Sequence, residues 1–326
     1  MKFRKVLAFS LAAVMAAGTL AGCQNKADKK YPTGGDVTVI IPKSPGGGTD
    51  ISTRGLLQYM KKYADGINFV PTNKPDGGGV TGMVETSKAK PDGYTLGAVT
   101  VELAMFPHQG KTTLTYKEFA PIAAQIAAPA ALIVPKDAPY NTVQEFADYC
   151  KANPNKVQMG NSGTGAIWDI ATTEFEDEFG VKVKHIPYPN GTADIVAALA
   201  GGHIDATLAD PSGVKSQYEA GTVKILGIMA DTRSKLYPDV PTFKELGHNL
   251  TIRAWAALVA PKDTPADVLK YLRDVAKKTV EDPEYQQYLM KQGIDPVEII
   301  GDDCYKMMEE DDALYAKALA DTSSSK

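Results

Sequence analysis

Short apolar segments alternate with amphipathic segments along most of the chain. Runs rich in β-branched and apolar residues each predict a β-strand: 37–41, 67–70, 94–100, 156–160, 182–187, 206–208 and 224–230. Between these runs, apolar positions recur with the spacing of one helix face, as at Leu56, Leu57 and Met60 within the segment 51–63. Strands that are separated by helices are typical of a parallel α/β architecture.

One segment of the chain is repeated. The sequence ALIVPKDAP at 131–139 recurs as ALVAPKDTP at 257–265, and each copy precedes a predicted amphipathic helix. Two matching units that bracket the middle third predict two lobes joined by two crossings, although chance similarity of two strand ends is the alternative. We expect 135–251 to form the second lobe, and 37–134 to form the first lobe together with 252–326. The cleft of such a hinged clamp is its natural binding site.

The N-terminus is typical of an exported protein. Basic residues precede an apolar run at 6–17, which is the order found in a secretory signal peptide. The sequence LAGC at 20–23 looks like a lipobox, in which the cysteine thiol accepts a diacylglycerol. We therefore expect a signal peptide at 1–22, a lipid on Cys23 that anchors the protein to the membrane, and a tether at 23–36. An ordinary signal peptide with an incidental cysteine is the alternative.

Composition narrows the function classes. The 35 Lys and Arg against 39 Asp and Glu give a net charge of −4, which argues against nucleic acid as a partner. The hydrophobic fraction of 44% is enough for two packed cores. Two cysteines, Cys150 and Cys304, follow the lipobox; we expect two inert thiols, and one disulfide bridge is the alternative. Scattered histidines without metal-ligand spacing predict no metal and no cofactor.

Two glycine-rich turns carry the candidate chemistry. PGGGTD at 45–50 follows the first predicted strand and precedes a helix, and GNSGTG at 160–165 has the same setting. Glycines let several backbone N–H groups turn toward one point, and the next helix adds its unpaired N–H groups and the positive end of its dipole. Such a turn holds phosphate, sulfate or carboxylate. One turn alone fits a tight connection equally well, but two turns facing each other across a cleft favour anion binding.

Enzyme motifs are incomplete. No Gly-Lys-Ser/Thr follows either turn, and Ser162 lies one position short of the Gly-x-Ser-x-Gly elbow. Because no nucleophile is paired with a base, we do not expect an enzyme. An enzyme acting on a small anionic substrate, phosphorylated or carboxylate, in the same cleft is the alternative. A surface lipoprotein with a signalling or adhesive role is a third possibility.

The motifs together resemble a known family. In order, they are VTVIIPKSPGGGTDISTR, NKPDGGG, AKPDGYTL, MGNSGTG, HIPYPNGTADIVAALAGGHIDATLAD and GIMADTRSKLYPDVPTFKELG. This order resembles the substrate-binding proteins of tripartite tricarboxylate transporters, which include the Bordetella uptake-gene receptors. The resemblance implies an α/β, two-lobed type II periplasmic-binding-protein fold with a hinge of two crossing strands. It also implies an extracytoplasmic receptor, which we expect to be a monomer, that binds a small carboxylate. The ligand would pass to a permease with one large and one small membrane subunit.

The resemblance also implies which residues bind the ligand. They lie on the two turns, on a cleft-lining tyrosine and at one strand end: Gly46, Gly47, Gly48, Thr49, Asp50, Asn161, Ser162, Gly163, Thr164, Gly165, Ala166, Tyr188 and Asp210. Backbone donors of this kind bind a carboxylate well in a cleft that excludes water on closing.

The chain departs from its relatives near the expected cleft. Ala166 and Asp169 replace the Thr and His that are common there, and Glu102 stands where small hydroxyl residues are usual. The added negative charge disfavours a tricarboxylate, so we expect one carboxylate in the turns and an amine, amide or hydroxyl at the other end of the ligand. The alternative is that Glu102 and Asp169 face solvent or cap helices.

Overall fold

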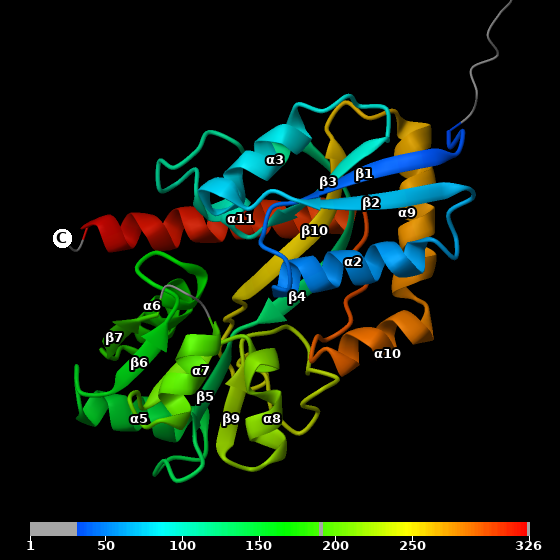
Figure 1. Cartoon of the computed structure of the whole chain (residues 1–326). Coiled ribbons are helices and arrows are strands. Elements are labelled where there is room, and N and C mark those ends of the chain that lie inside the picture. The colour runs from blue at the N-terminus through cyan, green and yellow to red at the C-terminus, as the bar shows by residue number, and fades with distance from the viewer. Residues whose placement is uncertain (1–30, 189–191, 325–326) are drawn as a thin grey trace, which may run out of the picture.

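The computed structural model describes residues 31–188 and 192–324, with side chains up to residue 320 (Figure 1). The predicted signal peptide at 1–22, Cys23 and most of the predicted tether lie outside the described residues. Within these ranges the chain forms two five-stranded sheets, each with its own helices. We call the elements around the first sheet the first lobe and those around the second sheet the second lobe.

The first sheet has the spatial order β2 (Ile67–Asn73), β1 (Gly35–Ile41), β3 (Thr95–Thr100), β10 (Arg253–Pro261) and β4 (Phe119–Pro129). Strand β1 is parallel to β2 and β3, whereas β10 is antiparallel to β3 and β4. One face packs against α2 (Gly48–Met60), α9 (Ala266–Val280) and α10 (Pro283–Lys291). The other face packs against α3 (Val80–Ser87), α4 (Glu102–Met105) and α11 (Asp302–Ser324).

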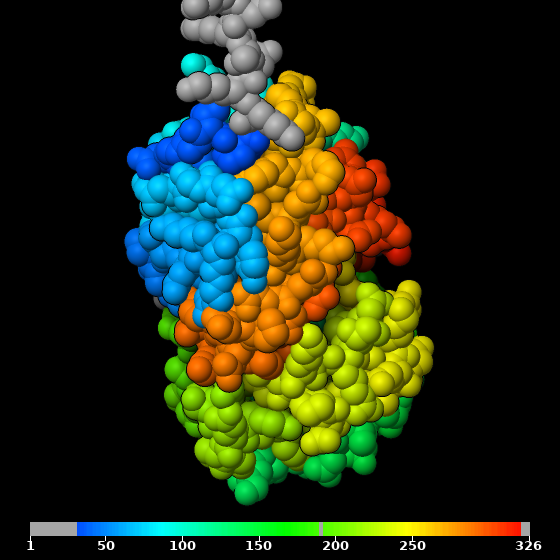
Figure 2. Space-filling model, turned by 90° about the vertical axis from the view of Figure 1, so that its right-hand side faces the viewer, coloured from blue at the N-terminus to red at the C-terminus, as the bar shows by residue number. Residues whose placement is uncertain are grey.

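The second sheet has the spatial order β7 (Lys184–Pro187), β6 (Gln158–Asn161), β8 (Ala206–Ala209), β5 (Ala131–Pro135) and β9 (Val223–Ile228). Strand β6 is parallel to β7 and β8, and β5 is antiparallel to β8 and β9. Its helices are α5 (Val143–Ala152), α6 (Ile167–Phe179), α7 (Thr192–Ala200) and α8 (Lys215–Glu219). Figure 2 shows this lobe, in green and yellow, below the first lobe.

The two sheets have equivalent topologies. In each, three parallel strands are followed across the sheet by two further strands, and the fourth position is taken by β10 in one sheet and β5 in the other. These are the strands that carry the repeated sequence, and both end at its first proline, Pro135 or Pro261. The repeat therefore marks equivalent strands of the two lobes, and the predicted two-lobed α/β fold is confirmed.

The lobes are joined where two segments cross. Strand β4 continues into β5 through the single residue Ala130, and a second segment returns from β9 to β10. Ala130 N–H donates to the Ile252 carbonyl at 2.8 Å, and Met229 N–H donates to the Ala130 carbonyl at 2.8 Å. The first change of sheet thus comes at Ala130. The boundary predicted from the sequence, after residue 134, was wrong because β5 pairs only with strands of the second sheet.

The long helix α11 contacts both lobes. It packs against α4 and β4 of the first lobe and against α6 of the second. Asp311 of this helix is buried and accepts hydrogen bonds from the Arg253 guanidinium at 2.8 and 3.2 Å, and Tyr315 Oη donates to the Arg253 carbonyl at 3.2 Å. Since Arg253 begins β10, this ion pair fixes α11 to one of the two crossing segments.

Cys150 and Cys304 are both free and buried, and burial raises the pKa of each thiol to about 12. A thiol that stays protonated is a poor nucleophile, so the prediction of two inert thiols agrees with their surroundings. Along the described ranges, none of the helices is both long and apolar enough to span a bilayer. No cluster of possible metal-ligating side chains occurs in the same ranges.

The Arg253–Asp311 pair gives a stability prediction. Arg253→Met leaves a buried carboxylate without its partner and should lower the free energy of unfolding by about 3–5 kcal/mol. The double variant Arg253→Met, Asp311→Leu removes both charges and should recover at least half of that loss. Urea denaturation of the three proteins measures the effect. Additive losses in the double variant would show that the two side chains do not interact.

Candidate functional site

A cavity of about 220 Å³ lies between the two lobes. Its walls come from the N-termini of α2 and α6, the end of β3, the crossing strands β4 and β10, and the end of β8. This volume is large enough for a small organic molecule. The cavity therefore lies where the sequence predicts a binding cleft.

The first glycine turn is shaped by a carboxylate on the helix that follows it. Asp50, the third residue of α2, is buried and accepts from Gly46 N–H at 3.0 Å, from Arg54 Nε at 2.8 Å and from Asn73 Nδ2 at 2.8 Å. Burial alone would raise the pKa of Asp50, but the hydrogen bonds from Gly46, Asn73 and Arg54 hold it below its usual value. The Asp50 carboxylate therefore stabilises the turn through hydrogen bonds within the protein.

The second turn repeats this arrangement. Asp169, the third residue of α6, accepts from Gly165 N–H at 2.8 Å, from Asn161 Nδ2 at 2.7 Å and from His185 Nδ1 at 2.6 Å. Gly163 and Gly165 have φ of +101° and +71°, which side chains rarely adopt, so glycine is required at both positions. Both turns are therefore folded back onto the third residue of the next helix.

Backbone donors remain unpaired at both helix starts. The N–H groups of Gly48 and Thr49 at the start of α2, and of Ile167 at the start of α6, have no hydrogen-bond partner among the described residues. The next donor in α6 differs, because Trp168 N–H is capped by Ser162 Oγ at 3.2 Å. Gly48, Thr49 and Ile167 all line the cavity. The cavity therefore receives unpaired donors and the positive ends of two helix dipoles, one from each lobe.

A hydroxyl and an ion pair complete the polar lining. Thr100, at the end of β3, is only 2% exposed, and its Oγ1 has no partner among the described residues. Lys43 Nζ donates to Glu102 Oε1 at 2.6 Å and to the Gly78 carbonyl at 3.2 Å. Asp210 accepts from the N–H and hydroxyl of Ser212, and burial raises its pKa. The Thr100 hydroxyl is therefore available to bond a ligand, whereas the charge of Glu102 is neutralised by Lys43.

The predicted site residues separate into two groups. Gly48, Thr49, Glu102 and Asp210 line the cavity. The rest lie behind or beside it. Asp50 and Asn161 are buried within the turns, and Tyr188 donates its N–H to the Asn161 carbonyl. The remaining predicted residues form the two turns outside the cavity lining: Gly46, Gly47, Ser162, Gly163, Thr164, Gly165 and Ala166.

One expectation from the sequence is wrong. Asp169 does not add negative charge to the cleft, because it is 8% exposed and its carboxylate is held within the turn. The alternative, that Asp169 faces solvent or caps a helix, is not what the structure shows either, because its carboxylate bonds Gly165 N–H, which lies before the helix. Glu102 does line the cavity, but its charge is matched by Lys43.

Sequence reasoning missed Lys43, Ile167 and Trp168 as lining residues, as well as Thr192 at the start of α7. The only available signal for Lys43 was its place between the first strand and the first glycine turn. Trp255 and Ala254 were missed because strand β10 carried no signal that one of its ends faces the cleft.

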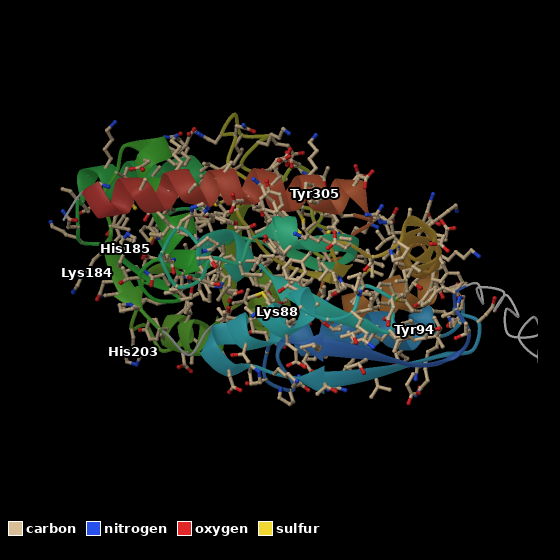
Figure 3. All side chains as sticks on the ribbon, turned by 90° about the horizontal axis from the view of Figure 1, so that it is seen from above. Lys88, Tyr94, Lys184, His185, His203 and Tyr305 are labelled. Carbon is tan, nitrogen blue, oxygen red and sulfur yellow. The ribbon has the colours of Figure 1, made fainter. Side chains whose placement is uncertain are left out.

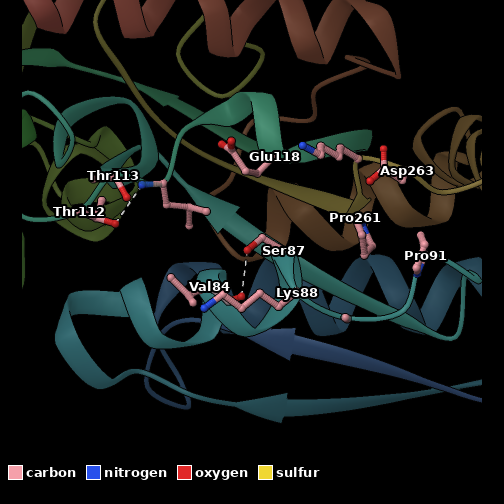
Figure 4. A pocket seen from close by; sticks show the side chains of 12 residues that line it. Val84, Ser87, Lys88, Pro91, Thr112, Thr113, Glu118, Pro261 and Asp263 are labelled. Carbon is pink, nitrogen blue, oxygen red and sulfur yellow. Dashed lines mark hydrogen bonds between the residues drawn. The ribbon is translucent and has the colours of Figure 1, made fainter.

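A larger cavity, of about 390 Å³, lies within the first lobe (Figure 4). It is bounded by the end of α3, the segment 112–118 and the end of β10. Some of its polar groups are already bonded to neighbours: Ser87 Oγ donates to the Val84 carbonyl at 2.9 Å, and Thr112 Oγ1 accepts from Leu114 N–H at 3.1 Å. Neither glycine turn nor any part of the second lobe reaches it, so the cavity between the lobes is the better candidate.

Comparison with known proteins places the chain in a family. The family profile "Tripartite tricarboxylate transporter family receptor" matches residues 56–321. The curated "UPF0065 protein in gbd 5'region" of Cupriavidus necator is 34% identical over 289 residues, which are 88% of this chain and 87% of that protein. The chain belongs to the tripartite tricarboxylate transporter receptor family. The predicted family is thus confirmed, and this family is a class of extracytoplasmic solute-binding receptors.

Solved structures share the fold. A TctC solute-binding protein from Polaromonas, without ligand, has a TM-score of 0.82 and 32% identity, and the match covers 89% of this chain and 99% of that one. MatC of Rhodopseudomonas palustris with bound malate has a TM-score of 0.69 and 24% identity, covering 89% of this chain and 100% of that one. The first glycine turn precedes the residues that the family profile matches, so its equivalence to the second turn rests on the geometry described above.

His185 supports the second turn electrostatically. It lies on β7 in the second lobe, at the opposite end of the molecule from Tyr94 of the first lobe (Figure 3). Its hydrogen bond to Asp169 and its contact with Glu176 Oε1 at 3.7 Å raise the pKa of His185 to about 9, so the imidazole is protonated at neutral pH. Burial alone would raise the pKa of Glu176, but its contacts with His185, Lys182 and the Val183 N–H outweigh burial and lower it. The ion pair between protonated His185 and Asp169 therefore stabilises the second turn.

This pair predicts a pH dependence. The pKa of His185 is about 6.5 in the unfolded chain and about 9 in the folded protein, so protonated His185 stabilises the fold. This contribution is complete below about pH 6.5 and is lost as the pH rises through about 9. We expect the native protein to lose roughly 2 kcal/mol of unfolding free energy from about pH 7 to about pH 10 that His185→Asn does not lose. Urea denaturation across this range measures the difference. Parallel pH profiles for the two proteins would contradict the assignment.

Proposed function

We propose that this chain is an extracytoplasmic receptor that binds a small carboxylate in the cavity between its lobes and delivers it to a tripartite tricarboxylate-type transporter. One observation carries the proposal: unpaired N–H groups at the N-termini of α2 and α6, from opposite lobes, line the same cavity. Helix N-termini bind anions through these N–H groups and the helix dipole. The buried, unpartnered hydroxyl of Thr100 adds a further donor on the wall of that cavity.

The charges of the lining favour a carboxylate over a phosphorylated ligand. Lys43 is the one cationic side chain among the lining residues that the structure describes, and it is already paired with Glu102. Asp210 adds a carboxyl group rather than a cation. A doubly charged phosphate would therefore meet neutral donors and carboxylates, which is costly in a closing cleft. A monoanionic group held by backbone donors fits this lining better.

The enzyme alternative has little support from the cavity. Among the described residues that line it there is no serine, cysteine or histidine, and their threonine, lysine and carboxylate side chains do not form a nucleophile–base pair. We therefore propose binding without turnover.

The partners follow from membership of the family, whose receptors work with transporters. We propose a monomeric receptor that docks on the large and small membrane subunits of such a permease. A lipid on Cys23, outside the described residues, would hold it at the membrane on the cell surface or in the periplasm.

Cavity size constrains the ligand. A cavity of about 220 Å³ admits a small acid, and the three carboxylates of citrate would meet Glu102 and Asp210 in its lining. Because Lys43 matches the charge of Glu102, a second carboxylate is repelled less than the sequence alone suggested. We propose a small acid with one carboxylate at the helix N-termini and a hydroxyl, amine, amide or second carboxylate at its other end.

Isothermal titration tests the proposal directly. Acetate, succinate, malate, aspartate, glutamate and citrate are titrated into the purified protein, and the reaction mixtures are then analysed for products. We expect at least one four- or five-carbon acid to bind with a Kd of about 10 μM or lower, citrate to bind at least tenfold more weakly, and no product to form. The proposal fails if no carboxylate binds, if citrate binds most tightly or if turnover is detected.

The Lys43–Glu102 pair gives a second prediction for the same site. Glu102→Gln leaves Lys43 with an unmatched positive charge, so succinate should bind about threefold to tenfold more tightly. Lys43→Met leaves Glu102 unmatched and should weaken succinate by a similar factor. Acetate, which reaches only one end of the cavity, should change less in both variants. Equal effects of the two variants on succinate would show that the pair does not face the ligand.

A further inference from the structure

A glutamine of the first lobe contacts the second glycine turn directly. Gln109 Nε2 donates to the carbonyl oxygen of Gly165 at 2.6 Å. Gln109 follows α4, which extends from the end of β3 in the first sheet, whereas Gly165 precedes α6 in the second lobe. The hydrogen bond therefore connects the two lobes. It does so at the second glycine turn, which precedes the unpaired Ile167 N–H at the cavity. Gln109 itself lies outside the cavity lining.

The segment that carries Gln109 is well fixed. Gln109 N–H bonds to the Met105 and Phe106 carbonyls at 3.3 and 3.2 Å, and Lys111 N–H bonds to the Phe106 carbonyl at 3.0 Å. His108 Nε2 lies 3.0 Å from Asp312 Oδ1 on α11, the helix that packs against both lobes. The amide of Gln109 is thus presented from a hydrogen-bonded turn that is braced against α11.

The contact fixes a carbonyl group of the second turn. Gly165 N–H is held by Asp169, and Ala166 N–H is held by the Gly163 carbonyl at 2.9 Å. The Gly165 carbonyl, held by Gln109, belongs to the peptide unit just before Ala166. The next N–H along the chain is that of Ile167, the unpaired donor at the cavity. The orientation of that donor therefore depends on a peptide unit that the first lobe holds.

The other end of the Gln109 amide has no such role. Its Oε1 is buried and has no partner among the described residues. A buried acceptor without a partner is unfavourable and calls for an explanation. The explanation lies at the donor end: only this orientation of the amide lets Nε2 donate to the Gly165 carbonyl, and it leaves Oε1 without a partner.

We propose that Gln109 is a positioning residue of the ligand site, which holds the second glycine turn in its binding geometry and slows ligand release by linking the lobes. The part that concerns release rests on the proposed function. Gln109 acts through Gly165 and the start of α6, without contact to the ligand.

Two substitutions and a matched control test this role. Gln109→Leu keeps the approximate size and removes the donor, and Gln109→Glu keeps the shape but sets a carboxylate against the Gly165 carbonyl. The control is Gln286→Leu, since Gln286 Nε2 donates to the Val280 carbonyl at 3.0 Å entirely within the first lobe. All three variants lose a glutamine hydrogen bond to a backbone carbonyl, but only two lose one between the lobes.

Hydrogen–deuterium exchange of the segment 160–170 is measured first, without ligand. We expect exchange to be about fivefold faster in both Gln109 variants and unchanged in Gln286→Leu, while peptides from β1 and β2 exchange as in the native protein. If one Gln109 variant fails to fold, the other still decides the outcome. Native exchange rates in the folded Gln109 variants, or faster exchange in Gln286→Leu as well, would overturn the proposal.

Ligand kinetics are measured second, by stopped-flow with the tightest binder among succinate, malate, aspartate and glutamate. We expect the dissociation rate to rise about fivefold in both Gln109 variants, with the association rate changed by less than about twofold. An unchanged dissociation rate overturns the role in release. If none of these acids binds while exchange responds to Gln109, the proposed function fails and the positioning role stands.

Discussion

A carboxylate that turns back from the third residue of a helix onto the preceding turn shapes both halves of the candidate site. Asp50 holds Gly46 N–H and Asp169 holds Gly165 N–H, at 3.0 and 2.8 Å. Each carboxylate satisfies a donor that lies before the helix, and so leaves the first donors of the helix itself unpaired at the cavity. These two aspartates therefore help to fix the shape of the glycine-rich turns that place the donors at the cavity.

The rest of the fold places these two turns opposite each other. Equivalent sheets put each turn at the carboxyl end of its central parallel strand, β1 or β6, which is where α/β folds bind ligands. The crossing segments meet at Ala130, which is fully buried and bonded to both Met229 and Ile252. Because so few residues connect the lobes, a ligand held by donors from both sides favours the closed arrangement. Helix α11 and Gln109 add contacts that limit how the lobes move.

Sequence patterns predicted the features that depend on residues close together in the chain, namely the strands, the helices and the glycine turns between them. Strand, glycine turn and helix follow one another at 45–50 and 160–165, so both turns could be located from the sequence. Pairing between distant segments could not be predicted. Lys43 meets Glu102 across 59 positions, and His185 neutralises Asp169 across 16. The boundary at Ala130 was missed because it was placed at Pro135, the proline that ends the repeated strand, whereas the change of sheet comes directly after Pro129, which ends β4.

Amide chemical shifts in the ¹⁵N-labelled protein test the central claim most directly, namely that one carboxylate is held by the starts of both helices. Succinate is added while the Gly48, Thr49 and Ile167 amides are followed. The account predicts that all three shift downfield with a single affinity. The Gly46 and Gly165 amides, which already donate to Asp50 and Asp169, should shift far less. Shifts confined to one lobe, or larger at Gly46 and Gly165 than at the helix starts, would contradict it.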